Sequence, residues 1–316
     1  MAIASGRYHA LAIGRHSHLV YSWGLNDHGQ LGRAGVAERA AGRRACERGG
    51  RCRDGTPQPV RSPLPADGLK ARALAAGRYF SLALGLDGRV YAWGRCGCGR
   101  DAAVESEGAL MAGSQVYALR GGGIEGERAV AIAAGYSHIM ALTTSNALYT
   151  CESGDDGYGG RLTRVAESHG QLGRPGAALT PLRVPVDAFS PQYPLRLIAA
   201  GRCASFAVDA SGATFAWGCA QATGHPPPDA HAPRRLALLN GKRIVALAAG
   251  EYHALAAPTD GRILAWGAGA PSPSGGAVEV SGLPAHTGSD VLALAAGYQH
   301  SLVSLSVCGR AAVSEL

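Results

Sequence analysis

The chain has 316 residues, of which 47% are hydrophobic, 6% are aromatic and 46 are Gly. The apolar fraction is large enough to bury a core, which excludes a wholly disordered chain, and the glycines lack the three-residue period of collagen. The net charge is +7, but all basic residues except Lys70 and Lys242 are Arg, a bias that a GC-rich genome also produces. Charge alone therefore does not indicate nucleic-acid binding.

Targeting and redox signals are weak in this sequence. No run of about 18 apolar residues occurs, so we expect neither a membrane-spanning helix nor a membrane partner. The first seven residues lack the basic and apolar regions of a secretory signal. Eight cysteines without a Cys-x-x-Cys pair predict reduced thiols, as in cytosolic or nuclear proteins.

One phrase recurs six times along the chain. In full it reads Ala-Ala-Gly-x-x-His, and an alternating apolar run follows it. The anchor glycines are, in chain order, Gly6, Gly77, Gly135, Gly201, Gly250 and Gly297. The last two intervals are the shortest, at 49 and 47 residues, so earlier repeats carry insertions in a unit of about 50 residues.

Each unit continues with the pattern of a β-hairpin. In the second unit the alternating residues 81–84 precede an Asp87-Gly88 turn and a second run at residues 90–94. Equivalent second runs are residues 19–24, 214–218 and 263–267, and the four Trp of the chain all occupy this slot. The sixth unit is degraded, with residues 308–310 expected as its turn and 311–313 as its strand.

Short strands with Gly and aromatic residues at fixed places in units of this length are typical of propeller blades. We therefore expect an all-β chain, a β-propeller of about six detectable repeats, forming one domain over residues 1–316. The repeats are expected near residues 1–70, 71–128, 129–195, 196–243, 244–290 and 291–316, with a basic insertion at 33–56.

These residues carry a family resemblance. Gly-x-x-His, the Asp-Gly turn, Trp-Gly and then Asn-x-x-Gly-Gln-Leu-Gly resemble the regulator of chromosome condensation repeat, almost complete at residues 23–32 and partly kept at 170–173. The third unit has Thr150-Cys151 in place of Trp-Gly, and the second and fourth have Phe80 and Ala204 in place of His. The family usually closes with seven blades, so six anchors indicate either a six-bladed ring or a fragment of a larger one.

The remaining motifs favour structural roles. His9, His138, His253 and His300 recur once per repeat, so we expect each to form a buried hydrogen bond that fixes the Gly turn, and the Trp slot to serve packing. The glycine runs at 97–102 and 121–126 lack the following helix of a dinucleotide loop. His225, Asp229 and His231 lie in a Pro-rich insertion. We expect no catalytic residue, metal, cofactor or small-molecule substrate.

The sharper functional signal lies between each anchor glycine and the His position. These twelve residues are rich in Tyr and Arg, which dominate interface hot spots, and we expect the repeat to bring them to one rim. Packing between blades is the alternative role for the tyrosines. The predicted partner-binding residues are Arg7, Tyr8, Arg78, Tyr79, Tyr136, Arg202, Tyr252 and Tyr298.

A second candidate is the basic insertion, which has the composition either of an acidic-partner or phosphate-backbone site or of a solvated loop. It also includes Arg33 and Arg39, and its core arginines are Arg43, Arg44, Arg48, Arg51 and Arg53.

The resemblance implies three kinds of role. One is a non-enzymatic protein-interaction platform, often within a larger signalling or ubiquitin-pathway protein, and another is guanine-nucleotide exchange on a small GTPase. The third, a plant-type ultraviolet photoreceptor, requires Trp directly after the anchor Gly, where this sequence has Arg7, Arg78 and Tyr136. The chain opens on an anchor without a basic tail, so we expect a platform in the cytoplasm or nucleus, with the exchange factor as the alternative and nucleic acid not indicated.

Overall fold

The computed structural model describes residues 2–33, 53–60, 68–99, 115–154, 170–174, 179–185, 187, 189–223, 231–268, 276–283, 290–297, 300–307 and 310–315. Its contacts divide the chain into two units, residues 1–166 with 177–183 and residues 167–176 with 184–316. The first unit contains three sheets and the second contains three more, so the described residues form six antiparallel sheets from six repeats. Whether the repeats make one domain stays a prediction.

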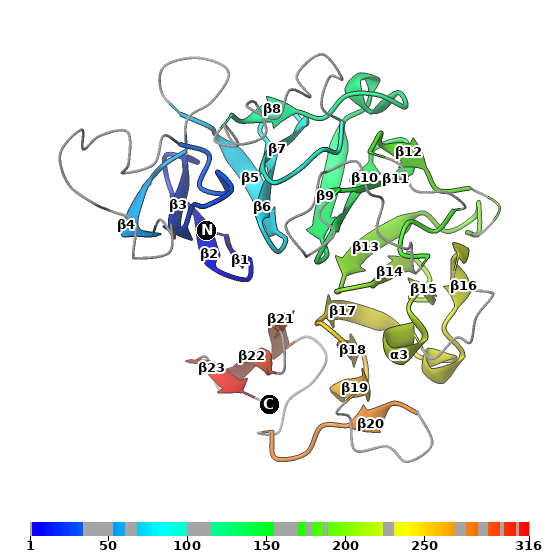
Figure 1. The fold of residues 1–316 in the computed structure, drawn as a ribbon. Coiled ribbons are helices and arrows are strands. Elements are labelled where there is room, and N and C mark those ends of the chain that lie inside the picture. The colour runs from blue at the N-terminus through cyan, green and yellow to red at the C-terminus, as the bar shows by residue number, and fades with distance from the viewer. Residues whose placement is uncertain are drawn as a thin grey trace, which may run out of the picture. The chain divides into compact units, whose positions relative to one another are not determined.

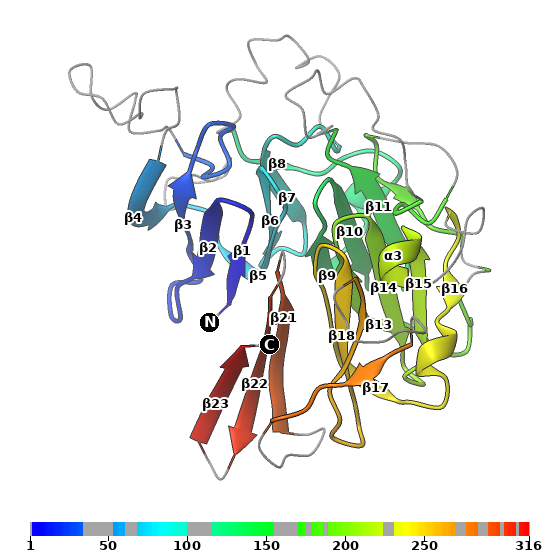
Figure 2. The same cartoon turned by 60° about the horizontal axis from the view of Figure 1, so that its bottom comes forward.

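The first unit contains three four-stranded sheets, each ordered as the chain runs (Figure 1). In each of them the second strand pairs with both the first and the third, as the hairpin pattern predicts. Figure 2 shows β1, β2 and β3 side by side in the first sheet. The strands are β1 (Ile3–Ser5), β2 (His9–Ile13), β3 (Val20–Leu25), β4 (Arg53–Pro59), β5 (Ala71–Ala76), β6 (Phe80–Gly85), β7 (Val90–Gly94), β8 (Tyr117–Ala118), β9 (Ala129–Ala134), β10 (His138–Thr143), β11 (Leu148–Glu152) and β12 (Leu182–Arg183), with a 3₁₀ turn η2 (Ile124–Gly126).

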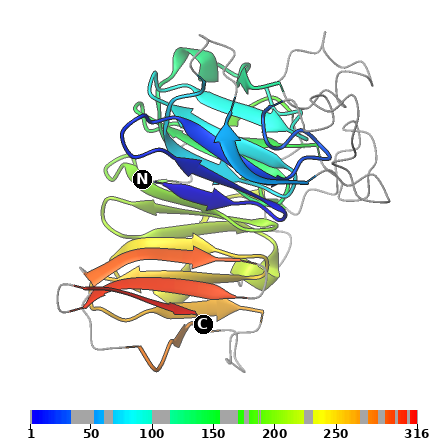
Figure 3. The same cartoon turned by 90° about the vertical axis from the view of Figure 1, so that its left-hand side faces the viewer.

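The second unit has two four-stranded sheets and one of three strands. Figure 3 shows the strands of the last sheet, in red, beside those of the sheet before it. The elements are β13 (Leu195–Ala200), β14 (Ala204–Asp209), β15 (Thr214–Gly218), α3 (Ala220–Thr223), β16 (Arg234–Arg235), η5 (Ala237–Leu239), β17 (Ile244–Ala249), β18 (His253–Pro258), β19 (Leu264–Gly267), β20 (Val278–Glu279), β21 (Val291–Ala296), β22 (Ser301–Val307) and β23 (Arg310–Glu315). β23 contains the predicted strand of the degraded repeat, residues 311–313. Arg310, predicted as part of the turn, is instead the first residue of this strand and pairs with Val307, and Cys308 and Gly309 lie outside the described residues.

In the second sheet of the first unit, β5 to β8, the alternating sequence does not produce alternating burial. Every residue of β6 and of β7 is buried, because this sheet contacts β2 of the sheet before it and β9 of the sheet after it. A strand covered on both faces buries both of its side-chain rows. The apolar clusters accordingly lie between neighbouring sheets, where Leu82, Leu84 and Ile139 pack together.

Neighbouring sheets are joined by a repeated set of hydrogen bonds. Gln30 lies in the loop after β3, and its main-chain oxygen accepts two hydrogen bonds from the next sheet. The donors are the indole nitrogen of Trp93 and the hydroxyl of Ser81, each at 2.8 Å. In the second unit Trp217 and Ser205 donate in the same way to the oxygen of Gln171, at 2.9 and 2.8 Å. The Gly-Gln-Leu-Gly motif is therefore an acceptor loop for the next sheet.

The last glycine of this motif is required by space as well as by backbone conformation. Gly32 has φ +63° and Gly173 has φ +70°, and a Cβ on either would lie 2.9 Å from the indole nitrogen of the Trp that the loop receives. Left-handed backbone and close approach together explain why this position is Gly.

The cysteines correct two sequence-based expectations. Cys98 bonds to Cys151 and Cys203 bonds to Cys219, so these four are not reduced thiols in the structure, while Cys96 is buried. His138 pairs with Glu152, which places Cys151, and not Thr150, in the Trp slot of the third repeat. In the third repeat the Cys151–Cys98 disulfide to the preceding repeat therefore replaces the indole hydrogen bond that Trp93 and Trp217 form in other repeats. The pairs are 53 and 16 residues apart in sequence, so spacing did not reveal them.

Candidate protein-interaction rim

The six anchor turns have one backbone design. In each, the anchor glycine N–H donates to the main-chain oxygen three residues later, as from Gly6 to His9 at 2.9 Å and from Gly250 to His253 at 2.8 Å. This bond joins the first strand to the second and leaves two residues at the tip of the turn. We call these two-residue tips, together with their side chains, the anchor rim.

Successive anchor turns lie in close contact within each unit. A Cβ on Gly6 would lie 2.4 Å from the main-chain oxygen of Gly77, and one on Gly201 would lie 2.5 Å from that of Gly250. Ala at these positions would collide with backbone, so Gly allows the turns to approach. The approach brings tip side chains of neighbouring repeats within reach of each other.

In the first unit five predicted residues form one cluster. The guanidinium of Arg7 donates to the Tyr136 hydroxyl at 2.8 Å and lies 5.2 Å from the ring centre of Tyr8. The guanidinium of Arg78 lies 4.7 Å from the ring of Tyr79 and 4.6 Å from that of Tyr136. The rings of Tyr8 and Tyr79 stack at 6.0 Å. This arrangement combines cation–π contacts with stacking.

In the second unit the cluster is centred on one arginine. Arg202 donates to Glu251 Oε1 at 2.5 Å and to the Tyr252 hydroxyl, and its guanidinium lies 4.9 Å from the Tyr252 ring. The Glu251 carboxylate is buried, with 7% of the residue exposed, whereas Arg202 and Tyr252 are half-buried. The buried carboxylate therefore depends on Arg202 for charge compensation.

The rim tyrosines also have a structural role, as the alternative interpretation predicts. Tyr79, Tyr136 and Tyr252 are half-buried between tip residues, while Tyr8 is 45% exposed. Packing and exposure thus coexist among the tip residues of the first unit.

Other predicted site residues lie outside the described residues or have a structural role. Tyr298 lies outside the described residues, as do Arg39, Arg43, Arg44, Arg48 and Arg51 of the basic insertion. Arg53 begins β4, and its side chain is likewise not described. Arg33, at the start of the insertion, is buried and donates to the main-chain oxygens of Ser22 at 3.1 Å and Thr56 at 3.3 Å, so it is a structural residue.

Sequence reasoning missed one rim neighbour. The His28 ring lies 4.6 Å from the Tyr79 ring, edge to face. His28 belongs to the acceptor loop that ends at Gly32, and the resemblance of this loop to the family repeat is the signal that would have placed it beside the next sheet. The disulfide partner Cys203 follows Arg202 directly at the tip of the fourth turn.

The repeated histidines join sheets. His9 Nε2 lies 2.8 Å from Ser81 Oγ in the next sheet, and His253 Nε2 lies 2.8 Å from Ser301 Oγ. Because the Ser81 hydroxyl already donates to Gln30, His9 donates through Nε2 as a neutral imidazole. Burial lowers the pKa of His9 and of His138 to about 4. The expected buried hydrogen bond is present at His9, but it fastens one sheet to the next and not the turn to itself.

Two limits on the chemistry apply to the described part of the chain. Its His, Cys, Asp and Glu residues include no group of three or more that could hold a metal ion. No helix there has the length and apolar character needed to cross a membrane.

Comparison with known proteins matches this architecture. Models of the regulator of chromosome condensation (RCC1) repeat match residues 17–84, and residues 2–30 and 71–100. The human E3 ubiquitin-protein ligase HERC2 is 28% identical over 272 residues, which are 84% of this chain and 5% of HERC2, so the chain spans a small part of that relative.

Two solved structures share the fold. Human WBSCR16 superposes with a TM-score of 0.74 at 20% identity, over 96% of this chain and 73% of that one. Prp20p from Saccharomyces cerevisiae, whose structure was reported with its binding to Gsp1p and histones, gives 0.69 at 24% identity, over 99% and 71%. The predicted β-propeller fold class is thereby confirmed.

Proposed function

We propose that this chain, which belongs to the RCC1-repeat family, is a non-catalytic platform of the cytoplasm or nucleus that binds another protein through the anchor rim. The observation that supports this is the gathering of Arg and Tyr side chains at the anchor turns of both units. These residue types combine large contact area with directional hydrogen bonds and are enriched among interface hot spots.

The rim arginines are pre-positioned for recognition. Arg7 is held between the Tyr8 and Tyr136 rings and uses one guanidinium donor on the Tyr136 hydroxyl. A guanidinium has five N–H donors, so others remain for carboxylate or carbonyl oxygens of a partner. Side chains already fixed by stacking lose less conformational entropy on binding.

The test compares a rim variant with a matched surface variant. The rim variant combines Arg7→Ala, Tyr79→Ala and Tyr252→Ala, and leaves Arg202 in place because its loss would strand the buried Glu251 carboxylate. The control combines Arg89→Ala and Arg262→Ala, two exposed residues at the hairpin ends of their sheets.

Proteins captured by each immobilised chain are quantified by mass spectrometry, and the leading partner is purified for a direct affinity measurement. We expect the rim variant to lose about 2 kcal/mol or more of binding free energy, which is the threshold for a hot spot, and the control to lose little. Equal affinity of the wild-type chain and the rim variant, with both folded, would reject the proposal.

Nucleotide exchange on a small GTPase is the second candidate, favoured by the likeness to Prp20p and by that protein's binding to Gsp1p. The discriminating measurement is the release of labelled GDP from purified small GTPases. Release accelerated by the wild-type chain but not by the rim variant would replace the platform with an exchange factor.

A further inference from the structure

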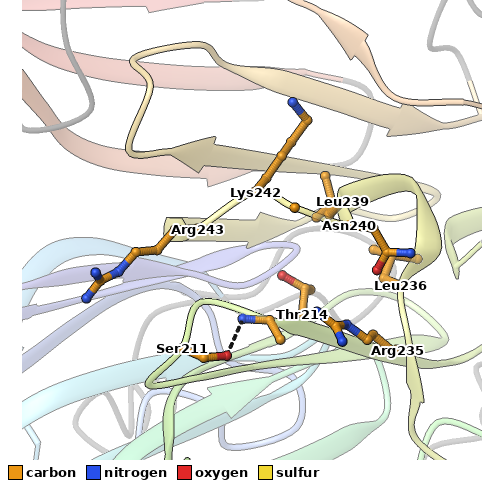
Figure 4. A pocket seen from close by; sticks show the side chains of 10 residues that line it. Ser211, Thr214, Arg235, Leu236, Leu239, Asn240, Lys242 and Arg243 are labelled. Atoms are coloured by element: carbon orange, nitrogen blue, oxygen red, sulfur yellow. Dashed lines mark hydrogen bonds between the residues drawn. The ribbon is translucent and has the colours of Figure 1, made fainter.

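A groove lies at the opposite end of β14 and β15 from the anchor rim. It has a volume of about 290 Å³ and lies between the hairpin turn of these strands and the segment that leads through η5 to β17. Polar side chains lining it are Ser211, Thr214, Arg235, Asn240, Lys242 and Arg243. Figure 4 shows the hydroxyl of Thr214 pointing toward the segment that carries Leu239 and Lys242, whereas the charged ends of Lys242 and Arg243 point away from Thr214.

The first unit has the same groove with different chemistry. There Leu119 N donates to Val90 O, as Leu236 N donates to Thr214 O, both at 2.8 Å, and Ala129 N donates to Gly88 O as Ile244 N does to Gly212 O. Counting from these bonds, Val90 corresponds to Thr214 and Glu127 to Lys242. The first groove, of about 350 Å³, is lined by Glu125 and Glu127 beside Arg89 and Arg120. The backbone therefore forms the groove in both units, and side chains make only the second one cationic.

Thr214 is the exceptional residue of its repeat position. Thr214 pairs with Val208 of the preceding strand, and the equivalent pairs of the first three repeats contain Val20, Val90 and Leu148. In the fifth repeat the equivalent residue is Ile263, which precedes Trp266 by three residues as Thr214 precedes Trp217. These four residues are all apolar. Thr214 is 3% exposed, and its Oγ1 is buried without a hydrogen-bond partner among the described residues. Burying an unbonded hydroxyl is unfavourable, so a polar group at an otherwise apolar position points to a ligand.

The cations of the groove are not neutralised within the described part of the chain. Arg235, Lys242 and Arg243 form no ion pair there. Two acids of these hairpin turns have other partners: Asp209 accepts from Ser211 and Ala213, and Asp260, which interacts electrostatically with Lys242, pairs with Arg262 at 2.6 Å. Net positive charge with hydroxyl and amide donors matches an oxyanion.

We propose that this groove binds a phosphate group, either as inorganic phosphate or as a phosphomonoester. Arg235, Lys242 and Arg243 supply charge, and the Thr214 hydroxyl donates to one phosphate oxygen. The site is independent of the anchor rim, because it lies at the other end of the same strands.

The experiment is calorimetric titration of the full chain with inorganic phosphate and, separately, with O-phosphoserine, at low ionic strength because exposed cations are screened by salt. Thr214→Val replaces the hydroxyl with the side-chain type that other repeats have, and Lys242→Glu installs the residue of the first groove. The control is Arg120→Gln in the first groove. Thermal unfolding of each variant checks folding, and Thr214→Val is expected to be no less stable than the wild type.

We expect Thr214→Val to weaken phosphate binding about tenfold, the loss of one hydrogen bond to a charged group, Lys242→Glu to abolish it, and Arg120→Gln to leave it unchanged. Tighter binding of O-phosphoserine than of phosphate assigns the site to phosphomonoesters, and equal binding assigns it to the free ion. Absence of binding by the wild-type chain to both probes overturns the proposal, as does equal weakening by Arg120→Gln and Lys242→Glu.

Discussion

Replacing His9 with Phe tests the role of the repeated histidine, because the second repeat already has Phe80 at this place. The His9 ring lies against Gly6 as the Phe80 ring lies against Gly77, and both side chains are buried. We therefore expect His9→Phe to fold. At neutral pH it should lose about 1 kcal/mol of unfolding free energy with the hydrogen bond to Ser81.

The larger effect is on pH dependence. Burial lowers the pKa of His9 from 6.5 to about 4 in the folded chain, so the unfolded chain binds more protons between these values. Stability due to the neutral imidazole is thus full above pH 6.5 and is lost as pH falls toward 4. Between about pH 7 and about pH 5 one such histidine removes about 2 kcal/mol, and His138, with the same lowered pKa, removes a similar amount.

The assay is urea unfolding followed by circular dichroism at both pH values. Wild type should lose about 2 kcal/mol more between them than His9→Phe does. Ser81→Ala is the control, since it removes the hydrogen bond but keeps the titrating ring, and should keep most of the pH dependence. If His9→Phe retains the full wild-type pH dependence, His9 is not the buried titrating group that the structure indicates.

Two further predictions concern the second unit. Gly173→Ala should lower the free energy of unfolding in urea by about 2–4 kcal/mol, because the left-handed backbone and the overlap of the new Cβ with the Trp217 indole act together. The control Gly241→Ala, at a residue with φ +75° and open space around its Cβ position, should lower it by only about 1 kcal/mol. Equal losses would contradict the close-approach argument. The Cys203–Cys219 disulfide joins two residues that are 16 positions apart in sequence, and its reduction should lower the free energy of unfolding by about 3 kcal/mol. A thermal unfolding midpoint that a thiol reductant leaves unchanged would refute a stabilising role.

The fold was predictable because its signals are local and repeated. The anchor phrase marks the end of each first strand, and turns such as Asp87-Gly88, where Gly88 has φ +83°, mark the hairpins. Periodicity could not predict that β6 and β7 are buried on both faces, since that depends on the neighbouring sheets. Position 151 was misaligned by one residue because the sequence of the third repeat has no Trp to fix the register.

The rim was predictable in position but not in its contacts. Its place between Gly and His follows from the repeat, so Arg7 and Tyr79 were placed at one edge. The pairing of Arg202 with a buried Glu251, and the contact of His28 with Tyr79, depend on how adjacent turns approach in space. The unbonded hydroxyl of Thr214 was invisible in sequence, because Thr is ordinary in a strand until its surroundings are known.

Because three of the Trp indoles form hydrogen bonds across boundaries between repeats, their intrinsic fluorescence can report on those boundaries. Trp93 responds to the boundary with the Gln30 loop, Trp217 to the Gln171 loop, and Trp266 to Ala222, to whose main-chain oxygen it donates at 2.9 Å. Each of these buried indoles therefore reports on the boundary that its hydrogen bond crosses. Single-tryptophan versions would show by fluorescence which boundary opens first under denaturant, and so in what order the repeats separate.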